Sequence, residues 1–163
     1  MKLQDGPMVK MKLPWISETI DVGIIGLDDF VGDETIQVRV SRYPEIVARY
    51  VSIMASNPDA MPAITLARIP VADTKSGTLL YLVDGFHRVA AAKRLEREVI
   101  RAEVIEARSI AEAKWMACRS NLKHGMPLNR KDLRRGFRAF MQAGMNIRED
   151  GTLLSYADIK DAF

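Results

Sequence analysis

Apolar residues recur along this chain at two different spacings, and each spacing predicts a different kind of element. Alternation of apolar with polar residues, as at Ile20, Val22 and Ile24, is typical of a strand with two unlike faces. Glycine, proline, aspartate and asparagine bound most of the segments that have this character. The predicted strands are residues 19–27, 35–40, 63–69, 78–83 and 99–107.

A spacing of three to four residues predicts helices between and after these strands. Residues 44–56 begin with Pro44 in the first turn and carry an apolar stripe that includes Tyr50. The other predicted helices are residues 86–94, 109–123, 129–144 and a last one from residue 155 onward. Their predicted capping residues are Ser109 with Glu112, Asn129, Gly144, and Ser155 with Asp158.

The order of the elements predicts an α+β fold. Strands and one helix come first, a strand-helix-strand unit follows, and only helices remain after it. We predict an N-terminal tail at residues 1–15, a core at 16–108 and a helical C-terminal extension at 109–163.

Length and composition exclude several classes of protein. The chain has 163 residues, 48% apolar and 28% charged, which favours one ordinary core over disorder. Its apolar runs are too short for a membrane span, and the N-terminus lacks the hydrophobic region of a signal peptide, so we expect a cytoplasmic protein without a membrane partner. The single cysteine, Cys118, falls within a predicted helix and is expected to be a small core residue.

Positive charge is concentrated in one stretch of the chain. The formal net charge is only +3, but seven cations stand between residues 119 and 138 against a lone Asp132. Leu133, Phe137 and Phe140 would dock on the core while the opposite face neutralises DNA phosphates. The alternative is that these cations simply form the solvent-exposed face of a helix. The predicted DNA-binding residues are Arg130, Lys131, Arg134, Arg135 and Arg138.

The segment Asp84-Gly85-Phe86-His87-Arg88 carries the best candidate chemistry. An apolar strand leads into a turn, Gly85 permits a backbone shape or close approach that a side chain forbids, and a helix begins at once. The free amides of that helix end, a guanidinium and an imidazole together suit a phosphate group. The alternative is an ordinary turn with a solvated Arg88, in which Asp84 caps the helix.

An acidic loop is a second candidate. Its carboxylates could hold a hard cation or act as a base, but their spacing does not match a calcium loop, and a solvated acidic turn is favoured. The residues are Asp28, Asp29, Asp33 and Glu34.

The segment at Gly85, followed by small residues and Lys93, resembles the Gly-x-x-Arg box of the ParB/sulfiredoxin superfamily. It is closest to the Asp-Gly-His-His-Arg and Gly-Gly-Cys-His-Arg forms. The likeness to ParB-like N-terminal and ParB-like nuclease domains covers about residues 16–145. It includes Ile36-Gln37-Val38-Arg39, then Met61-Pro62-Ala63-Ile64, and later Ser120-Asn121-Leu122-Lys123-His124-Gly125 with Pro127-Leu128.

This resemblance implies a small mixed sheet with flanking helices and a site for a nucleoside triphosphate, ATP or CTP, with magnesium as a candidate metal. The implied nucleotide and phosphate contacts are Gly85, Phe86, His87, Arg88, Arg39 and Asn121. Ser120 stands where ParB proteins usually have a glutamate, which puts magnesium coordination and hydrolysis in doubt. Phe86 stands where sulfiredoxins have the catalytic cysteine, so their chemistry is not expected.

The function implied is that of a nucleotide-binding protein acting on DNA or on a DNA-handling complex of a plasmid or other mobile element. Partition proteins, nucleases and NTPases, and inhibitors of conjugal transfer are the relatives to consider. As an NTPase or DNase, the chain would use His87 and Asp84 as catalytic residues. Partners would be a nucleotide, DNA, a protein partner or further copies of the chain. Arg88→Ala is expected to abolish nucleotide binding and leave the fold intact.

Two alternatives stay open. One is a kinase of the same fold that phosphorylates a free amino acid. The other is a non-enzymatic DNA- or protein-binding adaptor in which the nucleotide site is degenerate.

Overall fold

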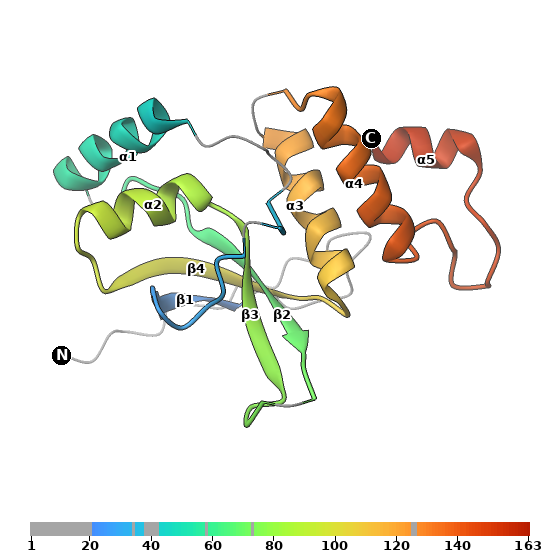
Figure 1. Ribbon diagram of the computed structural model, residues 1–163, viewed down its shortest axis with the longest axis horizontal. Coiled ribbons are helices and arrows are strands. Elements are labelled where there is room, and N and C mark those ends of the chain that lie inside the picture. The colour runs from blue at the N-terminus through green and yellow to red at the C-terminus, as the bar shows by residue number, and fades with distance from the viewer. Residues whose placement is uncertain (1–20, 34, 38–42, 58, 73, 125–126) are drawn as a thin grey trace.

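A four-stranded mixed sheet forms the centre of the protein. The computed structural model describes residues 21–33, 35–37, 43–57, 59–72, 74–124 and 127–163 (Figure 1). The strands are β1 (Asp21–Gly26), β2 (Ile64–Pro70), β3 (Thr78–Asp84) and β4 (Val99–Glu106), and their order in the sheet is β1-β4-β2-β3. The pairs β1/β4 and β2/β3 are antiparallel and β2/β4 is parallel. The predicted α+β class is confirmed.

Helices cover both faces of the sheet. On β2, Ile64 and Leu66 point into a core shared with α1 (Pro44–Ser56) and α2 (Phe86–Arg94), whereas Ala67 and Ile69 point into a core shared with α3 (Ile110–His124) and α4 (Arg130–Gln142). Figure 1 shows α1 with α2 on one side of the molecule and α3, α4 and α5 (Tyr156–Ala162) on the other. The second core takes residues from both sides of the predicted boundary at residue 108.

Most predicted elements are confirmed within a residue or two of their bounds. Helices α1 and α2 begin and end where the apolar spacing placed them. Asn129 and Ser155 each form the reciprocal capping box of α4 and α5. At α3 the box is incomplete: Ser109 accepts from the Glu112 amide at 3.2 Å, but the Glu112 carboxylate accepts from the amide and guanidinium of Arg108.

The strand predicted at residues 35–40 is wrong where the structure describes it. Thr35 and Ile36 lie in a turn, because Asp33 accepts the Thr35 amide on its carboxylate at 2.7 Å and the Ile36 amide on its carbonyl at 3.1 Å. Aspartate competes for backbone amides in this way and so diverts the chain from the strand. Residues 38–40 lie outside the described residues.

The predicted apolar stripe of α4 is only partly buried. Ala139 and Phe140 reach the core, but Phe137 is 45% exposed and Met141 is 40% exposed. Gly136 lets α4 approach α3 closely, since a Cβ at this position would lie 2.1 Å from Cys118 Sγ. Gly136 and Cys118 therefore form the close contact between α4 and α3, and Phe137 lies at the margin of this contact.

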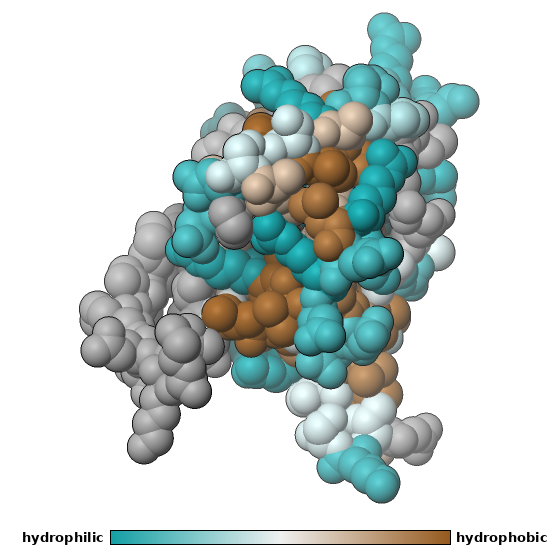
Figure 2. Space-filling model, turned by 90° about the vertical axis from the view of Figure 1, so that its left-hand side faces the viewer, coloured by the Kyte–Doolittle hydropathy of each residue, from teal (hydrophilic) through white to brown (hydrophobic). Residues whose placement is uncertain are grey.

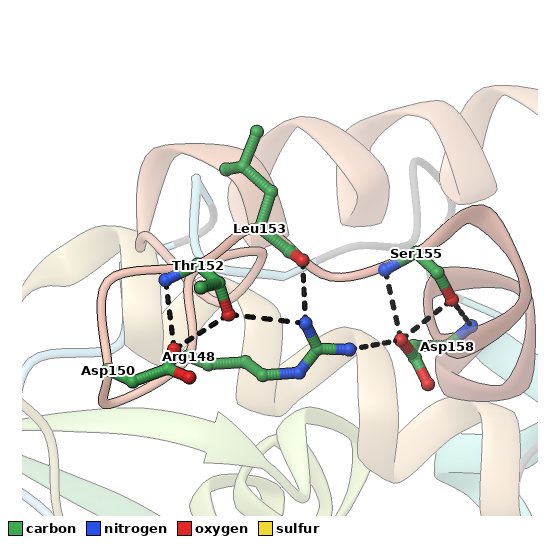
Figure 3. A network of polar contacts seen from close by, with 6 residues as sticks. All are labelled: Arg148, Asp150, Thr152, Leu153, Ser155 and Asp158. Atoms are coloured by element: carbon green, nitrogen blue, oxygen red, sulfur yellow. Dashed lines mark hydrogen bonds and ion pairs between the residues drawn. The ribbon is translucent and has the colours of Figure 1, made fainter.

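A polar network fixes the segment that leads into α5. The Arg148 guanidinium donates to the Leu153 carbonyl at 2.7 Å and to Asp158 Oδ2 at 2.6 Å, and the same oxygen accepts from the Ser155 amide at 2.9 Å (Figure 3). Beyond it, the ring centroids of Phe163 and Trp115 lie 4.9 Å apart. The network and this aromatic contact hold the C-terminal helix against α3.

The surface has no dominant apolar face in the view of Figure 2, which shows the side that lies at the left of Figure 1. Apolar side chains reach the surface there in separate patches between polar ones. Within the described residues, no helix is both long enough and apolar enough to span a bilayer.

Candidate functional site

The turn between β3 and α2 depends on Gly85. Its φ of +104° lies in the region that favours glycine, and an added Cβ would lie 2.5 Å from Ile64 Cγ2. Both reasons given for a glycine from the sequence, backbone shape and close approach, therefore hold at this position.

Helix α2 presents its first backbone amides at this turn. The first amide of the helix with a backbone partner in the preceding turn is that of Val89, which donates to the Gly85 carbonyl at 2.9 Å. Among the described residues no side chain caps the helix, and the Asp84 carboxylate pairs with Arg88 instead, so the expectation that Asp84 caps the helix is wrong. The amides of Phe86, His87 and Arg88 precede that of Val89 in the first turn, at the positive end of the helix dipole, where an anion is favoured.

Arg88 is held by its own chain. Its side chain is 10% exposed, and it donates to the carbonyls of Pro62 at 2.8 Å and Ala63 at 2.6 Å and to Asp84 Oδ2 at 2.9 Å. The guanidinium therefore joins the start of β2 to the end of β3. Because Arg88→Ala would leave these carbonyls without a donor, the expectation that this variant keeps the fold intact no longer holds.

An open pocket of about 80 Å³ lies at the start of α2. Asp84 to Arg88 form one wall, Asn121 of α3 contributes a second, and Gln37 and Tyr50 complete the lining with Val83. Four separate parts of the chain thus meet at one place. The structure brings together all the predicted nucleotide contacts that it describes; Arg39 lies outside the described residues.

His87 and Asn121 have defined partners in this pocket. His87 Nε2 accepts the Tyr43 amide at 3.4 Å, and the ring centroids of these two residues are 6.3 Å apart. Asn121 Nδ2 donates to the Ala117 carbonyl one turn earlier at 2.8 Å. Both side chains are partly buried and line the pocket, so each combines a fixed position with access to a ligand.

Sequence reasoning missed two lining residues, Gln37 and Tyr50. The spacing of Tyr50 places it in the apolar stripe of α1 and gives no sign of a binding site. Gln37 belongs to the segment Ile36 to Arg39 that resembles ParB domains, and this resemblance is the signal in the sequence that points to it. Gln37 is 8% exposed, so it brings a nearly buried amide to the pocket.

The described residues of the acidic loop, Asp28, Asp29 and Asp33, do not line the pocket. Asp29 accepts the Gly26 amide at 3.2 Å and Asp33 accepts the Thr35 amide at 2.7 Å, so both serve turns, while Glu34 lies outside the described residues. The described part of the chain holds no group of three or more His, Cys, Asp or Glu side chains placed to bind a metal ion. Asp84, the carboxylate in the pocket, is paired with Arg88. These residues do not form a magnesium site by themselves.

The predicted basic face of α4 is exposed. At 3.6 residues per turn, its five cations occupy about 140° of the helix circumference. Asp132, the one acid of the helix, lies on the opposite face, is 4% exposed and accepts the Asn129 amide at 3.2 Å in the capping box. The cations are Arg130, Lys131, Arg134, Arg135 and Arg138, and within the described ranges none forms an ion pair with a neighbouring side chain.

Comparison with known proteins places the fold. The sequence matches no protein-family model, and no curated protein matches it significantly. A structure described as the C222₁ form of a Pnob8-like ParB-N domain matches with a TM-score of 0.56 at 14% identity, over 88% of this chain and 60% of that one. A pNOB8-like ParB N-domain matches with a TM-score of 0.54 at 13% identity, over 88% and 56%. This chain has the fold of a ParB N-domain.

The ParB-like fold was expected from the box at Gly85 and is confirmed. A third match is the C-terminally truncated chromosome-partitioning protein ParB from Caulobacter crescentus, complexed with CTP-γ-S, with a TM-score of 0.49 at 15% identity over 80% of this chain and 68% of that one. The chain spans 60% and 56% of the two ParB N-domain chains above.

Proposed function

We propose that this ParB-like chain binds a nucleoside triphosphate, ATP or CTP, and acts on DNA or on a DNA-handling complex of a plasmid or other mobile element. One observation carries the proposal: the start of α2, Gln37, Tyr50 and Asn121 converge on one open pocket. The N-terminus of a helix is suited to anions, because its backbone amides and the helix dipole favour negative charge. The polar side chains around it supply further hydrogen bonds.

The pocket favours phosphate as the group that enters it. Its volume of about 80 Å³ is below the roughly 300–1,000 Å³ of pockets that enclose a small molecule. We therefore place a phosphate at the amides of Phe86 to Arg88 and the nucleoside across the open side. His87 and Asn121 would contact the phosphates, while Arg88 would hold the shape of the turn and contribute its charge.

Magnesium would depend on the nucleotide. Mg²⁺ is commonly bound through substrate phosphates with one or two carboxylates. Among the described residues, Asp84 supplies the carboxylate that lines the pocket. Because this carboxylate is paired with Arg88, it would contribute little to binding the metal ion. The enzymatic form of the proposal, nucleotide hydrolysis or DNA cleavage, assigns proton transfer to His87 and support of the charged groups to Asp84.

The basic face of α4 is the proposed contact with DNA. Five exposed cations on one face, with the lone acid of the helix buried on the other, give the charge distribution expected of a phosphate-binding surface. Arginine supplies four of the five, and its guanidinium can bind phosphate with two hydrogen bonds.

Calorimetry on matched variants tests the nucleotide site. We expect wild-type protein to bind ATP or CTP, and His87→Ala to weaken binding about tenfold or more, the range for losing a hydrogen bond to a charged group. Arg94→Ala, an exposed cation at the far end of the same helix, should leave affinity unchanged. Each nucleotide is measured with and without Mg²⁺.

The controls separate a site from a general charge effect. Equal losses in His87→Ala and Arg94→Ala would indicate nonspecific attraction and contradict the assignment. Arg88→Ala should lose both binding and thermal stability, because the guanidinium also serves the Pro62 and Ala63 carbonyls.

The contacts of Arg88 also favour a second candidate, the adaptor with a degenerate nucleotide site. A guanidinium that is 10% exposed and paired with Asp84 has less charge to offer a ligand than a free one. Salt-sensitive DNA binding by α4 together with no binding of ATP, CTP or GTP would support this candidate over the first.

A further inference from the structure

Two exposed apolar side chains of α4, Phe137 and Met141, lie beside its cations, and Leu133 in line with them is half-buried. Leu133, Phe137 and Met141 follow one another at intervals of four residues and form a ridge along the helix. At 3.6 residues per turn this ridge runs along one edge of the basic face, and Met141 falls between Arg130 and Arg134. Phe137 is 45% exposed and Met141 40%.

The core does not account for this ridge. Helix α4 supplies Ala139 and Phe140 to the core cluster, while the three ridge residues stand outside it. Phe137 does meet the ring of Phe163, with centroids 5.8 Å apart. That contact leaves nearly half of its surface to solvent. A lone exposed apolar residue is ordinary, but an aromatic ridge beside a row of cations has the composition of a nucleic-acid surface.

We propose that this surface of α4 binds single-stranded DNA in preference to duplex DNA. The inference rests on the proposed DNA contact of α4 and specifies its substrate. Bases of a single strand expose flat apolar faces that can lie on Phe137 and Met141, while Arg134 and Arg138 bind the flanking phosphates. In duplex DNA the base faces are stacked inside the double helix. Only the cations of α4 would then have partners, the backbone phosphates.

Charge complementarity favours a polyanion over an uncharged partner. Five cations lie in the arc beside the ridge, and they form no ion pairs with other side chains in the described part of the chain. Four of the five are arginines, whose planar guanidinium both binds phosphate and stacks on bases. An acidic protein helix would use the same cations and is an outcome of the test.

Fluorescence anisotropy on the full chain distinguishes the forms of DNA. The probes are a fluorescein-labelled oligothymidylate of 12 nucleotides and a labelled duplex of 12 base pairs, at one salt concentration. We expect tighter binding to the single strand. Phe137→Ala should weaken binding to the single strand roughly five- to a hundredfold, the range for losing one aromatic–base stack, and leave duplex affinity nearly unchanged.

Further variants keep the result interpretable. Phe137→Leu retains an apolar contact for Phe163 but removes the ring, and it should show the same selective loss. Arg134→Ala should weaken binding to both probes. Circular dichroism and thermal unfolding check each variant for an intact fold.

Each contrary result has a distinct meaning. Equal or tighter binding to the duplex, with Phe137→Ala and Phe137→Leu like wild type, would overturn the preference for single strands while the DNA contact of α4 stands. If neither probe binds, both the DNA contact of α4 and its preference for single strands are overturned. The same holds if an acidic peptide helix binds α4 and unlabelled DNA does not displace it.

Discussion

At the scale of single residues, Cys118 illustrates how burial sets chemistry. It is fully buried in α3, and burial, aided by the nearby Asp132 carboxylate, raises the pKa of its thiol to about 11. The thiolate is the reactive form of cysteine, so little of it exists at neutral pH. Cys118 is therefore a packing residue that meets Gly136 of α4, as expected from the sequence.

This predicts a slow reaction with thiol reagents. At pH 8, Cys118 should react with dithionitrobenzoate far more slowly in the native protein than in protein unfolded by guanidinium. In the native protein the reagent cannot reach the thiol, and little of the thiol is in the thiolate form. The chain has one cysteine, so the colour change reports this residue alone. Equal rates in native and unfolded protein would show that Cys118 is accessible and contradict the packing of α3 on α4.

Arg88 marks the limit of residue-level prediction at the site. The spacing Gly85 to Arg88 correctly placed a guanidinium at the start of a helix. It could not show that the carbonyls of Pro62 and Ala63 would come within 2.8 and 2.6 Å of it, because the arrival of β2 is a long-range event. For the same reason the pocket residues Gln37 and Tyr50 were not predicted as site residues.

At the scale of elements, the N-terminus of α5 is governed by one carboxylate. Hydrogen bonds from the side chain and backbone of Ser155 lower the pKa of Asp158 below its usual 3.8, and the charge and hydrogen bond of Arg148 act in the same direction (Figure 3). A lowered pKa in the folded state stabilises the fold above the unfolded value. This contribution is lost as pH falls through the lower, folded value.

Carbon-13 NMR of the carboxyl groups measures this directly. Asp158 should titrate with a midpoint below 3.8 in the native protein. In Arg148→Gln the midpoint should rise only part of the way toward 3.8, because the bonds from Ser155 remain. A midpoint at or above 3.8 in wild type would mean that the capping box does not form in solution.

Elements with strong local signals were predictable from sequence, and those decided by a competing side chain were not. Pro44 and an apolar stripe define α1, and Asn129 defines the start of α4. The apolar–polar alternation at residues 35–37 predicts a strand just as strongly. The Thr35 amide instead donates to the Asp33 carboxylate, and this hydrogen bond stabilises a turn. The predicted burial of Phe137 is wrong, and the apolar spacing of α4 does not reveal that Gly136 packs against Cys118 of α3.

At the scale of the whole molecule, the candidate site lies where the two helical layers meet at the end of β3. Four parts of the chain supply its lining: Gln37, the α1 residue Tyr50, the start of α2 and the α3 residue Asn121. A bound phosphate would therefore contact segments that are distant in sequence, as the ParB-like fold brings them together. The basic face of α4 belongs to the same layer as Asn121, since α3 and α4 pack on each other.

The central claim is that a nucleotide phosphate lies on the backbone amides of Phe86, His87 and Arg88. Proton–nitrogen NMR spectra of ¹⁵N-labelled protein, titrated with ATP or CTP and in parallel with adenosine or cytidine, test it most directly. We predict that these three amide signals shift with at least one triphosphate and not with either nucleoside. Unmoved signals at these three residues, under triphosphate that saturates any other response, would contradict the account.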